Sequence, residues 1–212
     1  MFESAADPIG SSIANRVTDK LTQVYEKIWC CRSGSAADTQ AINDIVQHYL
    51  SVYAYVSSQN KLTGSLMYDR PPTVQVAAAL FQELCYSNKE QLSAGLIIAG
   101  WDELNGPEVY HIPAGGSLHK QEFSIGGSGS TYIYGYCDAN FRENMTKEEG
   151  IEFVKNCNHP SVCLRLIIAL ALAMSRDGSS GGVIRMMILT GENPPERLMF
   201  AEPNIPKFWE KE

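Results

Sequence analysis

Two glycine- and serine-rich runs contain side chains whose types and spacing could form a binding or catalytic site. Residues 126–130 read GGSGS after a predicted strand, roughly as in a phosphate-binding loop. This run lacks both the lysine of a P-loop and the full G-x-G-x-x-G spacing. A tight turn therefore explains it better, and nucleotide binding stays an alternative. Residues 177–182 read DGSSGG and place one carboxylate beside two hydroxyls; taken alone, this run is typical of a flexible turn.

Other candidate groups do not form a recognisable site. Cys157, His159 and Cys163 lie close together, but a fourth ligand and a second spaced pair are missing, so we expect no metal. The six cysteines have irregular spacing, which favours reduced thiols. Neither H-E-x-x-H nor G-x-S-x-G occurs, so nothing in the sequence supports a zinc protease or a serine hydrolase.

Composition narrows the function classes further. The chain has 212 residues, of which 44% are hydrophobic and 19% charged, as expected of one globular domain. A net charge of -7 without a basic stretch argues against nucleic-acid binding. Arg165 interrupts the longest apolar run, and no signal peptide is visible, so we expect no membrane contact and a place in the cytoplasm and nucleus.

The elements that must position any site fall into clusters. Residues 35–38 form a capping box that opens a helix, whose pattern we expect to break in the polar segment 57–72. A second helix follows, with one apolar face made of Ala77, Leu80, Phe81, Leu84 and Cys85.

Strands are predicted before and after a third helix. Candidate strands are residues 94–101, 108–113 and 123–125. A capping box at 146–149 opens the third helix, which Pro160 should break. Residues 183–189 and 197–200 are predicted to pair. This order favours an α+β fold with sheets covered by segregated helices over a doubly wound sheet.

Several segments together resemble one family. Residues 13–21 (IANRVTDKL), 30–40 (CCRSGSAADTQ) and 176–185 (RDGSSGGVIR) are similar to proteasome beta subunits, in the family's order and spacing. Residues 126–136 and 141–149 add to the match. The resemblance is to the beta-1 type, with caspase-like specificity for cleavage after acidic residues.

The resemblance implies a fold, an activity and partners. The fold is a four-layer αββα sandwich of the N-terminal nucleophile hydrolase kind, here one domain over residues 1–212. The activity is that of a threonine-type endopeptidase in ATP-dependent, ubiquitin-linked protein degradation, without a cofactor. Expected partners are the other beta and alpha subunits of a stacked four-ring particle and unfolded polypeptide substrates.

The resemblance also implies site residues. The family's nucleophile is the hydroxyl of an amino-terminal threonine, activated by its own amine. Lys20 matches the lysine that favours loss of the hydroxyl proton, and Gly34 matches the backbone donor to the oxyanion. The positions that hydrogen-bond around the threonine are matched by Ser128, Asp177 and Ser180.

Arg32 matches the base of the specificity pocket, where a cation would pair with an acidic substrate side chain. Other pocket positions are matched by Thr18, Thr22, Ala36 and Gln40.

The match fails in three places. Residues 1–10 show neither the family's first strand pair nor its threonine, and Thr18 is the first threonine of the sequence. Segments 55–67 and 157–168 look inserted; the first could loop out, and the second contains Pro160. We expect an incomplete or mis-assembled form of a normal subunit, inactive as written. The alternative is a non-catalytic beta subunit that serves ring assembly.

Overall fold

The computed structural model describes residues 2–4, 7–9, 12–15, 18–63, 70–142, 145, 146, 149, 177 and 181–200. The chain divides into two compact units, which are taken in turn below. Unit 1 contains Lys20–Ser124 and Ile188–Glu196. Unit 2 contains Phe2–Asp19, Ile125–Met187 and Arg197–Glu212.

Unit 1 is built on one antiparallel sheet of five strands in the order β4-β5-β6-β7-β8. The strands are β4 (Leu21–Tyr25), β5 (Ile28–Gly34), β6 (Ala94–Asp102), β7 (Gly106–Ile112) and β8 (His119–Gln121). Burial alternates strictly along β6, so every second side chain enters the core. The strands predicted at 94–101 and 108–113 are thereby confirmed.

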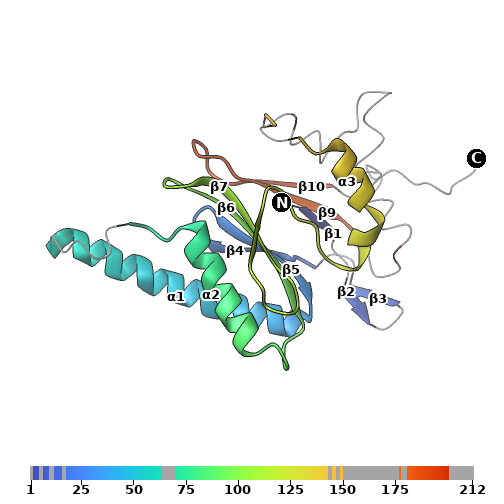
Figure 1. Cartoon of the computed structure of the whole chain (residues 1–212), viewed down its shortest axis with the longest axis horizontal. Helices are drawn as coiled ribbons and strands as arrows, with labels where there is room; N and C mark the ends of the chain where they lie inside the picture. Colours follow the sequence, from blue (N-terminus) through green and yellow to red (C-terminus); the bar gives the residue numbers. More distant parts are fainter. Residues whose placement is uncertain are drawn as a thin grey trace, which may run out of the picture. The chain divides into compact units, whose positions relative to one another are not determined.

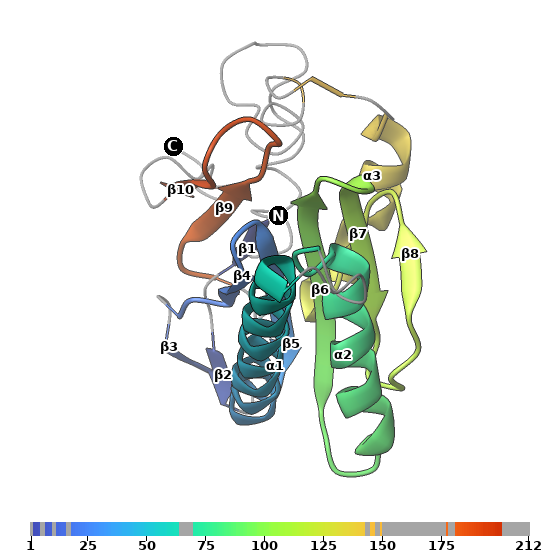
Figure 2. The same ribbon diagram turned by 90° about the vertical axis from the view of Figure 1, so that its left-hand side faces the viewer.

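Two helices, α1 (Ala36–Thr63) and α2 (Val74–Ser87), cover one face of this sheet (Figure 2). Their apolar stripes meet the inward side chains of β5, β6 and β7 in one core. Phe81 of α2 and Val46 and Leu50 of α1 are fully buried there. The apolar face predicted for the second helix is confirmed, with Leu80 and Leu84 packed at its margin.

Both helices begin at side-chain caps. Asp38 N donates to Ser35 Oγ at 3.3 Å, as the predicted capping box requires. The Asp38 carboxylate does not reach back to Ser35; it accepts from Ser93 N at 3.1 Å and ties α1 to the start of β6. Thr73 caps α2, and Asp102 of β6 adds a second bond by accepting from Val74 N at 3.0 Å.

The predicted break after residue 57 is wrong up to Thr63. Helix α1 continues through residues 57–63, and in Figure 1 its blue-green end extends past α2. The serine, glutamine, asparagine and lysine residues of this stretch are tolerated within a helix. The first glycine after residue 57 comes only at position 64. Tyr55 and the residues up to Thr63 are thus helical and do not loop out; residues 64–69 lie outside the described part.

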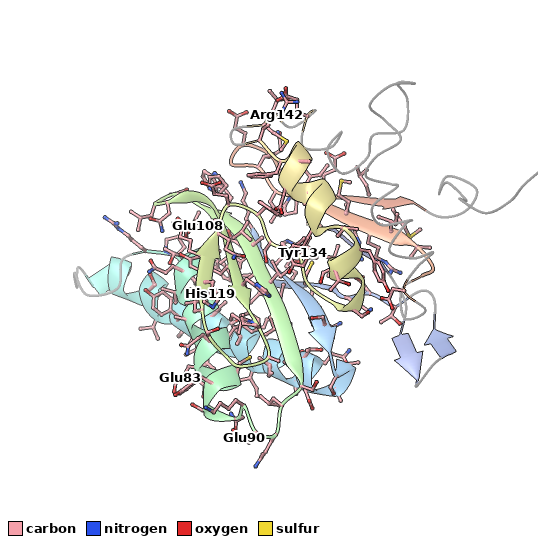
Figure 3. All side chains as sticks on the ribbon, turned by 45° about the vertical axis from the view of Figure 1, so that its right-hand side comes forward. Glu83, Glu90, Glu108, His119, Tyr134 and Arg142 are labelled. Carbon is pink, nitrogen blue, oxygen red and sulfur yellow. The ribbon has the colours of Figure 1, made fainter. Side chains whose placement is uncertain are left out.

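The strand predicted at 123–125 is also wrong, because the edge strand is β8, four residues earlier. Tyr110 of β7 pairs with Lys120, and the Lys120 ammonium lies 2.5 Å from the buried Glu108 carboxylate. Figure 3 labels Glu108 and His119 on these two neighbouring strands. The contact between Lys120 and the buried Glu108 carboxylate decides how β8 pairs with β7, and an apolar pattern in the sequence does not show such a contact.

The segment 188–196 joins unit 1 through Lys27, in the turn between β4 and β5. Lys27 Nζ donates to Gly191 O at 2.5 Å and lies 4.9 Å from the centre of the Trp101 ring. A Cβ at position 191 would come within 2.7 Å of that ring, so glycine is required for this close approach.

Unit 2 contains the remaining strands and a glycine-rich turn. Strand β1 (Phe2–Ser4) pairs antiparallel with β9 (Ile184–Ile188), and the sheet order is β1-β9-β10, with β10 at Glu196–Phe200. The predicted pairing of 183–189 with 197–200 is confirmed. Strands β2 (Asp7–Ile9) and β3 (Ser12–Asn15) form a short antiparallel pair.

The glycine-rich run continues as a 3-10 helix, η1 (Ser128–Tyr132), and then α3 (Tyr134–Asn140). Farther along, Thr146 N donates to the Glu149 carboxylate and Glu149 N donates to Thr146 Oγ1. This reciprocal pair confirms the capping box predicted for the third helix. Pro160 and the segment 157–168 lie outside the described residues.

Together the antiparallel sheets and segregated helices agree with the predicted α+β class. In the described part of the chain, no helix has the length and apolar character needed to cross a membrane.

Candidate functional site

The hairpin β4–β5 brings two of the predicted pocket residues, Arg32 and Thr22, together. Arg32 of β5 donates from its backbone N to Lys20 O at 3.0 Å. Its Nε donates to Thr22 Oγ1 of β4 at 2.9 Å. In the antiparallel register Thr22 faces Cys30, and its hydroxyl lies beside the Arg32 guanidinium. Arginine stays protonated at any working pH, so this partly buried group is a fixed cation.

Ala36 and Gln40 lie on the first turns of α1, where both are exposed. Residues four apart share one face of a helix, so these two follow one another on the surface. They begin four residues after Arg32 in the chain, which places this face directly after the strand that contains the cation.

Gly34 ends β5 in a backbone conformation that only glycine adopts easily. Its φ is +93°, and an added Cβ would lie 2.3 Å from Ser93 O. That carbonyl is held by Ser35 N at 2.7 Å, so it has little freedom to move away. The only hydrogen-bond donor that Gly34 itself offers is its backbone N–H, the chemistry expected of an oxyanion donor.

Lys20 stands directly before β4 and is partly buried. Because its carbonyl accepts from Arg32 N, the backbone of Lys20 is fixed to the backbone of Arg32, the predicted pocket cation. The two functions that the sequence assigned to Lys20 and Arg32 therefore share one piece of rigid sheet.

In unit 2, Ser128 Oγ donates to Asp177 Oδ2 at 2.6 Å. The two residues are 49 positions apart and come from the two glycine-rich runs. Gly127, with φ of +89°, turns the chain into η1, and Ser128 is the first residue of that helix. The run thus presents a hydroxyl to a carboxylate. Ser180 lies outside the described residues.

The backbone around Thr18 is anchored within unit 2. Arg185 of β9 donates to Thr18 O, and Arg197 of β10 pairs with Asp19. The sequence pattern did not indicate these two arginines, because their partners lie more than 160 residues away. Another residue that the pattern did not reveal is Thr39 of α1, which is 1% exposed and accepts from Arg32 Nη1 at 3.4 Å.

Buried thiols do not provide a nucleophile among the described cysteines whose pKa shifts are resolved. Burial raises the pKa of the Cys30 thiol far above its usual range and that of Cys85 to about 11. Burial also raises the pKa of Cys137. A thiol with a raised pKa is protonated and unreactive near neutral pH. The described residues also contain no cluster of three or more His, Cys, Asp or Glu arranged to hold a metal ion.

Comparison with known proteins decides the family. The model of the proteasome subunit family matches residues 5–189. The chain is 56% identical over 193 residues to a probable proteasome subunit beta type-1 of Schizosaccharomyces pombe, covering 91% of this chain and 75% of that protein. Proteasome subunit beta type-1 of Saccharomyces cerevisiae is 56% identical over 191 residues, covering 90% and 77% of the two chains. Proteasome subunit beta type-6 of Dictyostelium discoideum is 55% identical over 201 residues, covering 95% and 83%.

The chain belongs to the proteasome beta subunit family.

Family membership confirms the resemblance read from the motifs. Proteasome beta subunits belong to a family of threonine proteases and assemble with other proteasome subunits, and both statements apply to this chain at the level of its family. The matched range also includes the motif with Lys20, the β5–α1 junction with Arg32 and Gly34, and the run that begins at Asp177.

Proposed function

We propose that this subunit cleaves polypeptides after acidic residues as a threonine-type endopeptidase of the proteasome core particle. The observation that carries the proposal is the guanidinium of Arg32, fixed by Thr22 Oγ1 at 2.9 Å beside the family's catalytic motif. A fixed cation at the base of a pocket pairs with a glutamate or aspartate side chain by charge-assisted hydrogen bonds. An apolar side chain offers the guanidinium no such charge-assisted hydrogen bond.

The proposed reaction assigns a role to each matched group. The hydroxyl of an amino-terminal threonine attacks the scissile carbonyl, while the terminal amine takes the hydroxyl proton. The Lys20 cation favours loss of that proton, and Gly34 N–H donates to the oxyanion. Ser128, Asp177 and Ser180 orient the groups around the threonine by hydrogen bonds. Collapse of the tetrahedral adduct breaks the scissile C–N bond, and the protonated terminal amine gives its proton to the leaving amine. Water then hydrolyses the acyl-enzyme ester, which releases the new carboxyl terminus and restores the threonine hydroxyl.

No threonine occurs before Thr18 in the printed sequence. The reaction therefore requires a subunit whose amino terminus begins with such a residue. The second candidate is a non-catalytic subunit that contributes to ring assembly. Amino-terminal sequencing of the subunit from purified particles separates the two: a terminal threonine followed downstream by the IANRVTDKL motif supports catalysis, and its absence supports the assembly role.

The wider setting is part of the proposal. We infer a four-layer αββα sandwich of the N-terminal nucleophile hydrolase kind, placed in one of two beta rings between two alpha rings. Substrates would be unfolded chains delivered to the inner chamber, in the cytoplasm and nucleus. The antiparallel sheet of unit 1, with α1 and α2 on one face, supports the sandwich because it supplies one sheet and one helical layer.

The specificity is tested in particles that contain the subunit with a threonine terminus. Fluorogenic peptides that differ only in Glu or Leu at the cleaved position report the preference. Arg32→Ala should lower the Glu-over-Leu ratio of kcat/KM by about tenfold or more, since a charge-assisted bond contributes about 1.5–3 kcal/mol. Gln40→Ala is the matched control, because it alters another predicted pocket residue, on the exposed face of α1, without removing a charge. An unchanged ratio in Arg32→Ala would overturn the proposed specificity.

A further inference from the structure

Arg32 has a second hydroxyl acceptor besides Thr22, and it comes from a different element. Thr39 of α1 accepts from Arg32 Nη1 at 3.4 Å, while Thr22 of β4 accepts from Nε at 2.9 Å. The two acceptors address two different nitrogens of one planar group. They therefore restrict rotation of the guanidinium in its own plane, which one acceptor alone does not do.

The Thr39 hydroxyl is itself oriented by the helix. It donates to Ser35 O at 2.8 Å, with Ala36 O at 3.2 Å as a second acceptor. A hydroxyl has one proton and two acceptor lone pairs. With the proton committed to the helix backbone, the lone pairs are what Arg32 meets. Thr39 therefore acts toward Arg32 only as an acceptor.

Burial makes this arrangement stiff. Thr39 is 1% exposed, so water does not take the place of its hydroxyl as the acceptor of Arg32 Nη1 when that bond lengthens. Its own backbone N donates to Ser35 O at 3.0 Å, which holds the residue in the first turns of α1. The helix start, the buried hydroxyl and the strand cation thus form one rigid chain of bonds.

We propose that Thr39 is a positioning residue for cleavage after acidic residues, because its buried hydroxyl fixes the direction in which Arg32 presents its N–H groups to the substrate carboxylate. This inference rests on the proposed function. Arginine remains charged whether or not Thr39 is present, so the hydroxyl governs geometry and not charge. A purely structural threonine, which back-bonds to the preceding turn as threonines in helices do, would affect stability without affecting specificity.

The test uses assembled particles whose subunit carries a threonine terminus and Thr39→Val, which keeps the shape and removes the hydroxyl. We expect kcat/KM for cleavage after Glu to fall by about three- to tenfold, as the loss of the bond from Arg32 Nη1 allows. The bonds of the same hydroxyl to Ser35 O and Ala36 O are lost with it and should affect stability. Cleavage after Leu should stay within about twofold of the unmodified particle. The loss should appear in KM with kcat unchanged, because the pocket binds the side chain in both the ground state and the transition state.

Thr39→Ser is the matched control, because it keeps the hydroxyl and removes only a methyl group. It should retain the Glu-over-Leu ratio of the unmodified particle. If Thr39→Ser loses as much preference as Thr39→Val, packing and not the hydroxyl is responsible, and the proposal is wrong. If Thr39→Val is not incorporated, Thr39→Cys takes its place, because a thiol is a weak acceptor of nearly the same size. Failure of both variants to assemble would contradict the proposal by showing that the hydroxyl is needed for folding.

The outcomes also separate this inference from the proposed function. A Glu preference that Arg32→Ala abolishes and Thr39→Val leaves intact refutes the role of Thr39 alone. Particles without any Glu preference, or with one that Arg32→Ala does not change, refute the proposed specificity and the role of Thr39 with it.

Discussion

Replacing Gly34 with alanine should destabilise unit 1 and disturb the proposed oxyanion donor at the same time. At φ of +93° an L-residue is strained, at a cost of about 1–2 kcal/mol. The new Cβ would also lie 2.3 Å from Ser93 O, whereas real Cβ atoms essentially never come closer than 3.0 Å to such an atom. Relief requires movement of that carbonyl, which weakens its bond to Ser35 N.

The second effect adds to the first. A lost backbone hydrogen bond contributes about 0.5–1.5 kcal/mol, so the total loss in the free energy of unfolding should be about 1.5–3.5 kcal/mol. Gly106→Ala is the matched control, because Gly106 has φ of +74° but no atom within 4 Å of its added Cβ. It should show the strain alone, about 1–2 kcal/mol.

Urea unfolding followed by tryptophan fluorescence measures both variants. Trp29 and Trp101 lie on the adjacent strands β5 and β6, so they report directly on the sheet that contains Gly34. Equal losses in Gly34→Ala and Gly106→Ala would refute the close-contact argument. A loss below about 1 kcal/mol in Gly34→Ala would refute the strain argument as well.

Two further predictions follow from the pKa shifts in unit 1. Burial and the neighbouring His119 lower the pKa of His111 below its ordinary 6.5. The stability that is present above about pH 6.5 should therefore decline as the pH falls through the folded-state pKa of His111. His111→Gln should flatten that part of the curve of urea midpoint against pH. A pH profile that is the same in both proteins would show that His111 does not contribute. Iodoacetamide at pH 7.5 should modify Cys31 before Cys30 and Cys85, whose burial raises their pKa values, as peptide mapping would show; early labelling of Cys30 would contradict the buried core.

The sequence predicted those elements whose signals are local. Thr146 and Glu149 exchange both capping bonds, and the apolar run predicted as a strand forms β6. The end of α1 was mispredicted because the loss of an apolar pattern does not by itself end a helix. Ser57 shows the difficulty: a polar residue in the pattern is 3% exposed and donates to Arg70 O at 2.9 Å.

Contacts between distant residues could be predicted only through the resemblance. Nothing in the spacing of Ser128 and Asp177 shows that a hydroxyl meets a carboxylate at 2.6 Å across 49 positions. The contact of Arg185 with Thr18 O is of the same kind. The register of β8 depends on Glu108, whose burial follows from the way β7 packs and not from its own sequence neighbours.

The β5–α1 junction explains why fold and specificity are hard to separate in this chain. Within eight residues it contains Arg32, the proposed pocket cation, Gly34 with its positive φ, and the buried Thr39. Three backbone hydrogen bonds that the fold needs anyway hold this junction: Arg32 N to Lys20 O, Ser35 N to Ser93 O, and Thr39 N to Ser35 O. A substitution that alters shape here disturbs the sheet or the helix start. Near-isosteric changes such as Thr39→Val remove the hydrogen bonds of one side-chain hydroxyl and leave these backbone bonds in place, so they are the changes that distinguish chemistry from folding.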